Sequence, residues 1–276
     1  MTNVQINKVL LTVMVIVPFS TFAQKLPKIQ KSSVYAPATI KIDGKANEWD
    51  QKLEAYHPTN RLFYTVSNDN ENLYLTVKAT EAVAVKKIFV DGLTLTLLNN
   101  RQRKLPKGAE AITITYPSTA VTYTGIERAA GDYADLMEDS LINKDKVTLL
   151  TNTTNTKILT TFQKIQVKGI KEITDSLTLK NSFGMQALAQ FNKVMELTYE
   201  LAVPLKYLGL NGSTVISYNI KLNGVPAVEK TMYGKLPQPI VQSEGHDGRV
   251  DYDQEYLNQT TDFWGVYTLA KKELKP

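Results

Sequence analysis

The feature that most constrains the fold is a two-residue alternation of apolar and polar side chains, which recurs along much of the chain. In residues 73–79, every second position is apolar, and Tyr, Thr and Lys stand between. Residues 93–97 repeat the alternation after an Asp-Gly pair that is typical of a turn. Successive side chains of a strand point to opposite faces, so such a segment has one buried side. The pattern therefore predicts half-buried β-strands.

The same reasoning predicts further strands at residues 111–116, 158–167, 185–191, 194–203, 213–222 and 264–269. Many short strands with turn residues between them are typical of an antiparallel sandwich or barrel. Residues 126–142 instead repeat their apolar side chains at helical spacing, with acidic residues mostly off that stripe. We therefore expect a mainly β protein, an antiparallel β-sandwich with one accessory amphipathic helix.

The N-terminus has the pattern of a secretory signal peptide. Lys8 precedes an apolar run over residues 9–22, and Thr21 and Ala23 are the small residues of a cleavage site. A spanning helix would need about 20 apolar residues, and this run is shorter and contains Pro18. We expect cleavage after Ala23, which leaves 276 − 23 = 253 residues, and a periplasmic or secreted protein. The expected organisation is a signal peptide (1–23), a flexible leader (24–38) and one sandwich domain (39–276), without a membrane span after cleavage.

Composition excludes several classes of site. The chain has no cysteine, which rules out disulfides, thiol nucleophiles, thiolate metal sites and a lipidated cysteine. Its net charge of +5 is spread along the chain, which does not favour a nucleic-acid partner. The two histidines lie outside any Gly-x-Ser-x-Gly or His-Glu-x-x-His motif. We therefore expect a protein that is not an enzyme, and a hydrolase is an alternative without a motif to support it.

Residues 40–49 form the sharpest local motif, I-K-I-D-G-K-A-N-E-W. The two isoleucines predict a short strand, and Asp43 and Gly44 predict a turn, because glycine accepts a positive φ and aspartate bonds its own backbone. Glu48 and Trp49 follow directly. We expect Trp49 to fill the end of the sandwich. The alternatives are a sugar-stacking role for Trp49 and an acidic metal site.

A predicted hairpin over residues 66–75 carries Asp69 and Glu71 at its tip. Turn chemistry explains this composition. The alternative is that the two carboxylates bind Ca²⁺, which prefers oxygen ligands. No other cofactor is expected.

These motifs, in their order, resemble a known superfamily. The opening over residues 40–49, the D-x-E-N-L-Y-L-x-V strand and a Y-E-x-A-x-P segment with Tyr199, Glu200 and Pro204 are similar to the family 9 carbohydrate-binding module-like superfamily, which is related to DOMON domains. Residues 91–117 and 262–269 are similar to a version found in exported Bacteroidetes proteins of unknown role. The resemblance covers roughly residues 38–270 with gaps, and it implies a β-sandwich and, by association, glycan binding.

Residues 237–262 are long and polar, and they hold the candidate ligand-binding residues. Asp251, Asp253 and Glu255 alternate, which would place their carboxylates on one side of an extended loop. Tyr252 and Tyr256 offer stacking faces beside them, and Trp264 begins the last predicted strand. Together these side chains could hold a cation or the hydroxyl groups of a sugar; a solvated acidic loop is the alternative.

The sequence therefore predicts an exported, non-catalytic binding or accessory protein, with a glycan as its first expected ligand. The alternative is a structural or protein-interaction module of the cell envelope that binds no small ligand. Its partner would then be another envelope protein.

Overall fold

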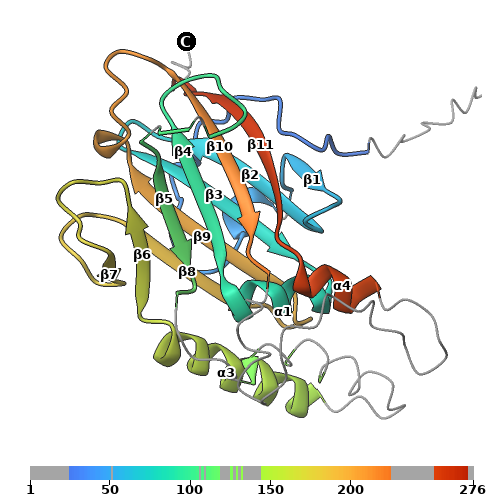
Figure 1. The fold of residues 1–276 in the computed structure, drawn as a ribbon. Helices are drawn as coiled ribbons and strands as arrows, with labels where there is room; N and C mark the ends of the chain where they lie inside the picture. Colours follow the sequence, from blue (N-terminus) through green and yellow to red (C-terminus); the bar gives the residue numbers. More distant parts are fainter. Residues whose placement is uncertain are drawn as a thin grey trace, which may run out of the picture.

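The structure is a computed structural model that describes residues 25–50, 52–105, 107–108, 110–118, 125–126, 129, 132, 144–224 and 252–272. Two antiparallel sheets pack face to face as a β-sandwich (Figure 1). The predicted fold class is therefore confirmed. The described α-helices gather at one end of the sandwich, near the lower edge of the view in Figure 1.

One sheet has five strands in the order β1-β2-β3-β9-β8. Their bounds are β1 Ala55–His57, β2 Leu62–Asn68, β3 Asn72–Ala79, β9 Leu197–Pro204 and β8 Gln186–Phe191. The central β3 and β9 pair over their whole length, from Asn72 opposite Pro204 to Ala79 opposite Leu197.

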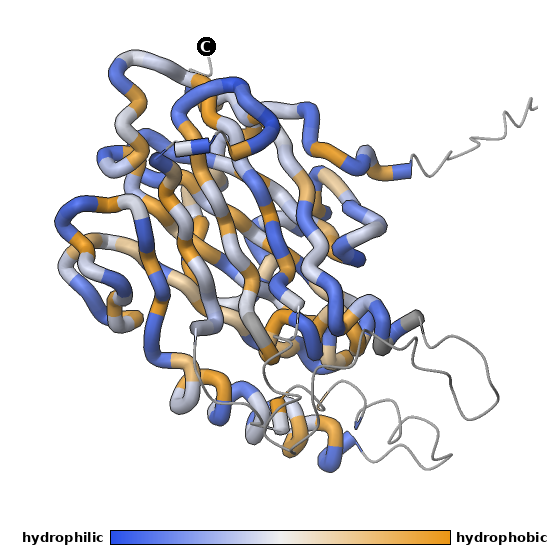
Figure 2. The backbone as a smooth tube through the Cα atoms, in the orientation of Figure 1, coloured by the Kyte–Doolittle hydropathy of each residue, from blue (hydrophilic) through white to orange (hydrophobic). Residues whose placement is uncertain are grey.

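The other sheet has six strands in the order β11-β10-β4-β5-β6-β7. Their bounds are β11 Thr261–Thr268, β10 Val215–Leu222, β4 Leu93–Leu98, β5 Ile112–Tyr116, β6 Lys164–Lys168 and β7 Ser176–Thr178. Many strands of both sheets follow the alternation of the sequence, and Figure 2 shows orange stretches interrupted by white or blue ones across the sheets.

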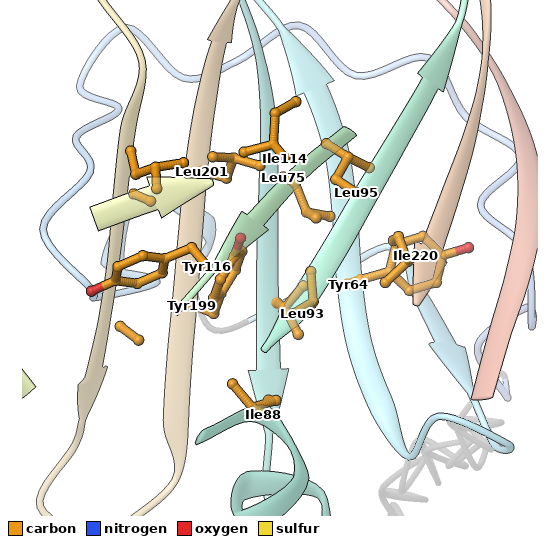
Figure 3. Close-up of a cluster of buried hydrophobic side chains, with 14 of the residues drawn as sticks. Tyr64, Leu75, Ile88, Leu93, Leu95, Ile114, Tyr116, Tyr199, Leu201 and Ile220 are labelled. Atoms are coloured by element: carbon orange, nitrogen blue, oxygen red, sulfur yellow. The ribbon is translucent and has the colours of Figure 1, made fainter. Parts of the chain in front are cut away.

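The core lies between the sheets. Figure 3 shows side chains of both sheets that point toward one another, among them Leu75 and Leu201 from one sheet and Leu95 and Ile114 from the other. Buried tyrosines also cross this space, and the hydroxyls of Tyr64 and Tyr218 share a hydrogen bond of 3.2 Å. These two hydroxyls are therefore paired, which offsets the cost of removing them from water. The hydroxyls of Tyr116 and Tyr199 are buried without a hydrogen-bond partner among the described residues.

The described helices differ from the one that the sequence predicts. They are α1 Ala82–Asp91, α3 Lys144–Thr161, α4 Tyr252–Asn258 and the short 3₁₀ turns η1 Asn47–Trp49 and η3 Leu205–Tyr207. The strand predicted over residues 158–167 is wrong for residues 158–161, because they form the last turn of α3. The side chain of Ile158 is buried and packs this end of the helix against the core. The helix predicted over residues 126–142 lies almost wholly outside the described residues.

Packing of the chain begins before Ile40, although residues 24–38 were expected to form a flexible leader. The side-chain amide of Gln30 donates to the carbonyl of Val66 (2.8 Å) and accepts from its N–H (2.7 Å). Tyr35 then pairs with Asn68 as an isolated parallel bridge. Residues 30–35 thus occupy the part of the β2 edge that the short β1 does not reach.

Residues 36–50, called the strap below, cross the outer face of the five-stranded sheet. Ala36, Ile40 and Ile42 pack against Tyr74 of β3 and Ala202 of β9. This apolar contact covers an outer face that would otherwise be exposed to solvent.

Candidate functional site

The turn of the I-D-G motif rests on Glu200 of β9. The Oε2 atom of Glu200 accepts hydrogen bonds from the N–H groups of Asp43 (3.0 Å) and Gly44 (2.8 Å). Gly44 has a φ of +74°, and a Cβ there would lie 2.7 Å from the Cγ of Gln190. The position therefore requires glycine, both for its backbone conformation and for the close approach of the strap to the sheet.

Glu200 is a buried carboxyl group, with only 1% of its surface exposed. Burial raises the pKa of Glu200 to about 8, although the two N–H donors lower it, and the negative charges of Glu48 and Asp43 raise it further. Its Oε1 atom and the Oε2 atom of Glu48 are buried without a hydrogen-bond partner among the described residues. Glu200 therefore keeps its proton near neutral pH and serves to hold the strap.

The other motif residues, Trp49, Tyr199 and Pro204, lie in the strap, in the core and at the end of β9. Trp49 lies in η1 of the strap and is half-buried, outside the buried core that it was expected to complete. Tyr199 is fully buried between the sheets, and Pro204 ends β9. Two of the segments that carry the family resemblance, residues 40–49 and 199–204, thus meet as one structural contact between the strap and β9.

Asp69 uses its carboxylate within the β2–β3 hairpin. Oδ1 accepts from the N–H groups of Glu71 (2.8 Å) and Asn72 (2.7 Å), and Oδ2 accepts from the hydroxyl of Tyr74 (2.7 Å). Burial raises the pKa of Asp69, but these bonds outweigh it and bring the pKa below its usual value. Among the described residues, no three His, Asp or Glu side chains converge as a metal site. The Asp69 carboxylate therefore acts in the turn.

The alternation of carboxylates expected over residues 251–255 is wrong, because Tyr252–Asn258 is the helix α4. Residues two apart on a helix point about 200° apart, so Asp253 and Glu255 face different directions. Asp253 accepts a hydrogen bond of 2.8 Å from Nη1 of Arg61. Asp251 and the side chain of Tyr252 lie outside the described residues.

Tyr256 of α4 is covered by two cations at the helical end of the sandwich. The guanidinium carbon of Arg61 lies 4.5 Å from the centre of its ring, and Nζ of Lys87 lies 4.0 Å from it. The Tyr256 hydroxyl donates to the carbonyl of Asn60 (2.7 Å), and burial raises its pKa. Its ring is therefore occupied by cation–π contacts and offers no open platform to a sugar.

Lys87, which the sequence analysis did not single out, is the most unusual charge of this cluster. It lies on α1 with 1% of its surface exposed, and Nζ donates to the hydroxyl of Thr261 (3.1 Å). None of the ion pairs among the described residues includes it. Burial, with the like charge of Arg61, lowers the pKa of Lys87 to about 8. So little exposure leaves no approach for a substrate, so the group is not a nucleophile in this conformation.

Trp264 lies half-buried on the outer face of the six-stranded sheet. It begins a row of residues that stand opposite one another across five strands: Trp264, Asn219, Thr96, Thr113 and Lys168. With strands about 4.8 Å apart, the row spans roughly 19 Å. An aromatic ring, an amide, two hydroxyls and an ammonium group therefore share one line across the sheet.

A second row runs beside the first, through Asp262, Lys221, Thr94, Thr115 and Gln166. The hydroxyls of Thr94 and Thr115 share a hydrogen bond of 2.7 Å, and Asn219 donates to Asp262 (2.5 Å) and ties the rows together. The threonine trough is the hollow of about 570 Å³ over Thr94, Thr96, Thr113, Thr115, Gln166, Lys168 and Lys221, with walls that include Leu105, Ser118 and Asn223.

A larger hollow lies on the opposite face of the molecule, beside the strap. It has a volume of about 1090 Å³ and is called the lysine groove below. Its walls carry Lys25, Lys31, Lys52, Lys78, Glu54 and Glu196, and its other lining residues are Leu26, Pro27, Ser32, Leu53, Phe63 and Thr80.

The sequence predicts some residues of the threonine trough and the lysine groove, but not how they come together. Alternation identifies the outward residues of each strand, for example Thr94, Thr96, Thr113 and Thr115. It does not say which strands are neighbours, so neither the rows nor the lysine groove follow from it. Of the predicted ligand-binding residues, Trp264 lies in the same row as Thr96 and Thr113, but it is not part of the lining of the threonine trough, because Asn219 of β10 stands between Trp264 and Thr96. Tyr256 and Asp253 lie in the cationic cluster at the helical end.

Comparisons of the chain with family models, with curated proteins and with solved structures find no match. The structure itself shows two antiparallel sheets packed as a sandwich, which is the coarse fold that the resemblance implies. Among the described residues, no helix is long and apolar enough to cross a membrane.

Proposed function

We propose that the chain is an exported, non-catalytic binding protein whose ligand is a glycan held in the threonine trough beside Trp264. The observation that carries the proposal is the line of an aromatic ring, an amide, hydroxyls and an ammonium group across one sheet face. A concave site with a few convergent polar groups is the usual setting for a ligand.

The chemistry of the trough suits a saccharide. Sugar hydroxyls both donate and accept hydrogen bonds, as do the threonine hydroxyls and the amide of Gln166. Trp264 adds an apolar ring at the start of the same row, two strands from Thr96, where the C–H face of a longer saccharide can pack. The ligand would therefore meet complementary groups along the whole row.

The trough supports binding better than hydrolysis. Glycoside hydrolysis uses a pair of carboxyl groups on either side of the scissile bond. The described residues that line the trough include no Asp, Glu or His. The resemblance to carbohydrate-binding modules points in the same direction, toward a protein that holds a glycan without cleaving it.

Calorimetric titration of the purified protein with a panel of neutral and acidic polysaccharides tests the proposal. We expect at least one glycan to bind, and Trp264→Ala to weaken that binding about tenfold, as the loss of one stacking contact would. Trp49→Phe is the matched control, because Trp49 belongs to the strap on the other sheet. Absence of binding across the panel would remove the proposal in favour of a protein-interaction module.

A further inference from the structure

The N-terminal segments cover part of the outer face of the five-stranded sheet. The strap covers Tyr74 and Glu200, and the N–H of Glu54 binds the hydroxyl of Thr65 (3.0 Å). Beyond these contacts lies the lysine groove, whose floor includes Phe63 of β2 and Lys78 of β3, opposite one another in the sheet. The groove is therefore a built part of the fold, framed by the N-terminal segment and the sheet.

The charge of the groove is positive. Its lining holds four lysines against two glutamates, a balance of 4 − 2 = +2. Lys78 forms an ion pair of 2.6 Å with Glu196, which accounts for one charge of each sign. The remaining lysines, Lys25, Lys31 and Lys52, then face a single carboxylate, that of Glu54. A ligand with several negative charges would complement this surface.

The lining of the groove also includes an aromatic ring. Phe63 is partly exposed and packs against Tyr56 with ring centres 4.6 Å apart, which fixes the orientation of its ring. Ser32 and Thr80 add hydroxyl groups to the lining. A ring, two hydroxyls and several ammonium groups together suit a ligand with C–H faces, hydroxyls and carboxylates.

The neighbouring sheet edge is closed to a peptide that would add as a strand. The N–H of Tyr56 in β1 binds the carbonyl of Pro27 (3.0 Å), and the amide of Gln30 occupies both backbone groups of Val66. Strand addition derives its affinity from unpaired backbone groups at such an edge. Recognition in the groove must therefore come from side chains.

We infer that the lysine groove is a second binding site, separate from the threonine trough, and that its ligand is a carboxylated polysaccharide. The inference shares with the proposed function the idea that the ligand is a glycan, but it concerns other residues. Its failure can therefore be told apart from failure at the trough.

The test measures binding of polygalacturonate, a carboxylated polysaccharide, to the full chain by calorimetry. In the variant Lys25→Gln/Lys31→Gln/Lys52→Gln we expect the affinity to fall about tenfold, the summed loss of three exposed charge contacts. The control is Lys144→Gln/Lys171→Gln/Lys180→Gln, which removes the same charge from exposed positions outside the groove. Trp264→Ala should leave this binding unchanged, because Trp264 lies on the other sheet. Thermal melting of each variant checks that it folds.

Three results would overturn the inference. Polygalacturonate could fail to bind, both triple variants could lose affinity equally, or poly-glutamate could bind as tightly as polygalacturonate. The second would show a general charge effect, and the third would identify an acidic peptide as the occupant. If neutral glycans bind but polygalacturonate does not, the proposed function of the threonine trough stands and the inference about the lysine groove fails.

Discussion

Replacing Lys87 with methionine removes a buried ammonium group and leaves a chain of similar length. The pKa of Lys87 is lowered from 10.5 to about 8 in the folded protein. Each pKa unit corresponds to about 1.4 kcal/mol, so the charge costs about 3 kcal/mol of folding free energy at pH 7. The variant also loses the hydrogen bond to Thr261 and the contact with the Tyr256 ring, so its gain in stability is smaller than this cost. The difference in stability between the variant and the wild type still depends on pH.

The sign of that dependence follows from proton uptake. Between pH 8 and pH 10.5 the unfolded chain binds a proton at Lys87 that the folded protein has released, so the wild-type stability rises with pH in this window. The cost of about 3 kcal/mol at pH 7 should therefore shrink to about 1 kcal/mol at pH 10. Lys87→Met should be more stable relative to the wild type at pH 7 than at pH 10.

Urea unfolding, followed by tryptophan fluorescence at several pH values from 7 to 10, measures this difference. Lys86→Met, one residue earlier on α1 and partly exposed, is the control for removing a lysine from the helix. A difference between Lys87→Met and the wild type that stays constant from pH 7 to pH 10 would refute the reasoning.

Two further predictions concern the sheets. Because the pKa of Glu200 is raised from 4.5 to about 8 in the folded protein, its contribution to stability is complete below pH 4.5 and declines as pH rises to 8. Glu200→Gln should remove up to about 5 kcal/mol of that change in urea unfolding. In Gly265→Ala the new Cβ would lie 2.1 Å from Cζ of Tyr218, so we expect a loss of about 3 kcal/mol or more, visible as a lower melting temperature. An unchanged melting temperature would contradict this packing.

The strands could be predicted from the sequence because their alternation is regular, as in β3 and β4. Helix α1 could not, because Val83, Val85 and Ile88 give its sequence the β-branched character of a strand. Its helical form is stabilised by tertiary packing, in which Ala84, Val85 and Ile88 are fully buried.

Helix α3 escaped prediction for a different reason. Its sequence is rich in threonine and asparagine, which are poor helix formers, and it buries only Thr151, Thr154 and Ile158. Asn155 instead attaches the helix to β8 by accepting from the N–H of Phe191 (2.8 Å) and donating to its carbonyl (2.9 Å). Such a contact leaves no periodic signal in the sequence.

The candidate sites depend on contacts between distant segments. Gly44 and Glu200 are 156 residues apart in the chain, and their motifs gave no sign that they touch. The lysine groove likewise brings residues 25–32, 52–54, 63, 78–80 and 196 together. These meetings follow from the order of strands in the sheet, which alternation does not specify.

The side-chain amides of Gln30 and Asn155 make the two edges of the five-stranded sheet sensitive to deamidation. Each pairs with both backbone groups of one residue at an edge of the same sheet, Val66 on β2 and Phe191 on β8. Deamidation of either side chain would set a carboxylate oxygen against a backbone carbonyl, where a donor is needed. The edge would then open, and a freed strand edge is a template for association with a second molecule.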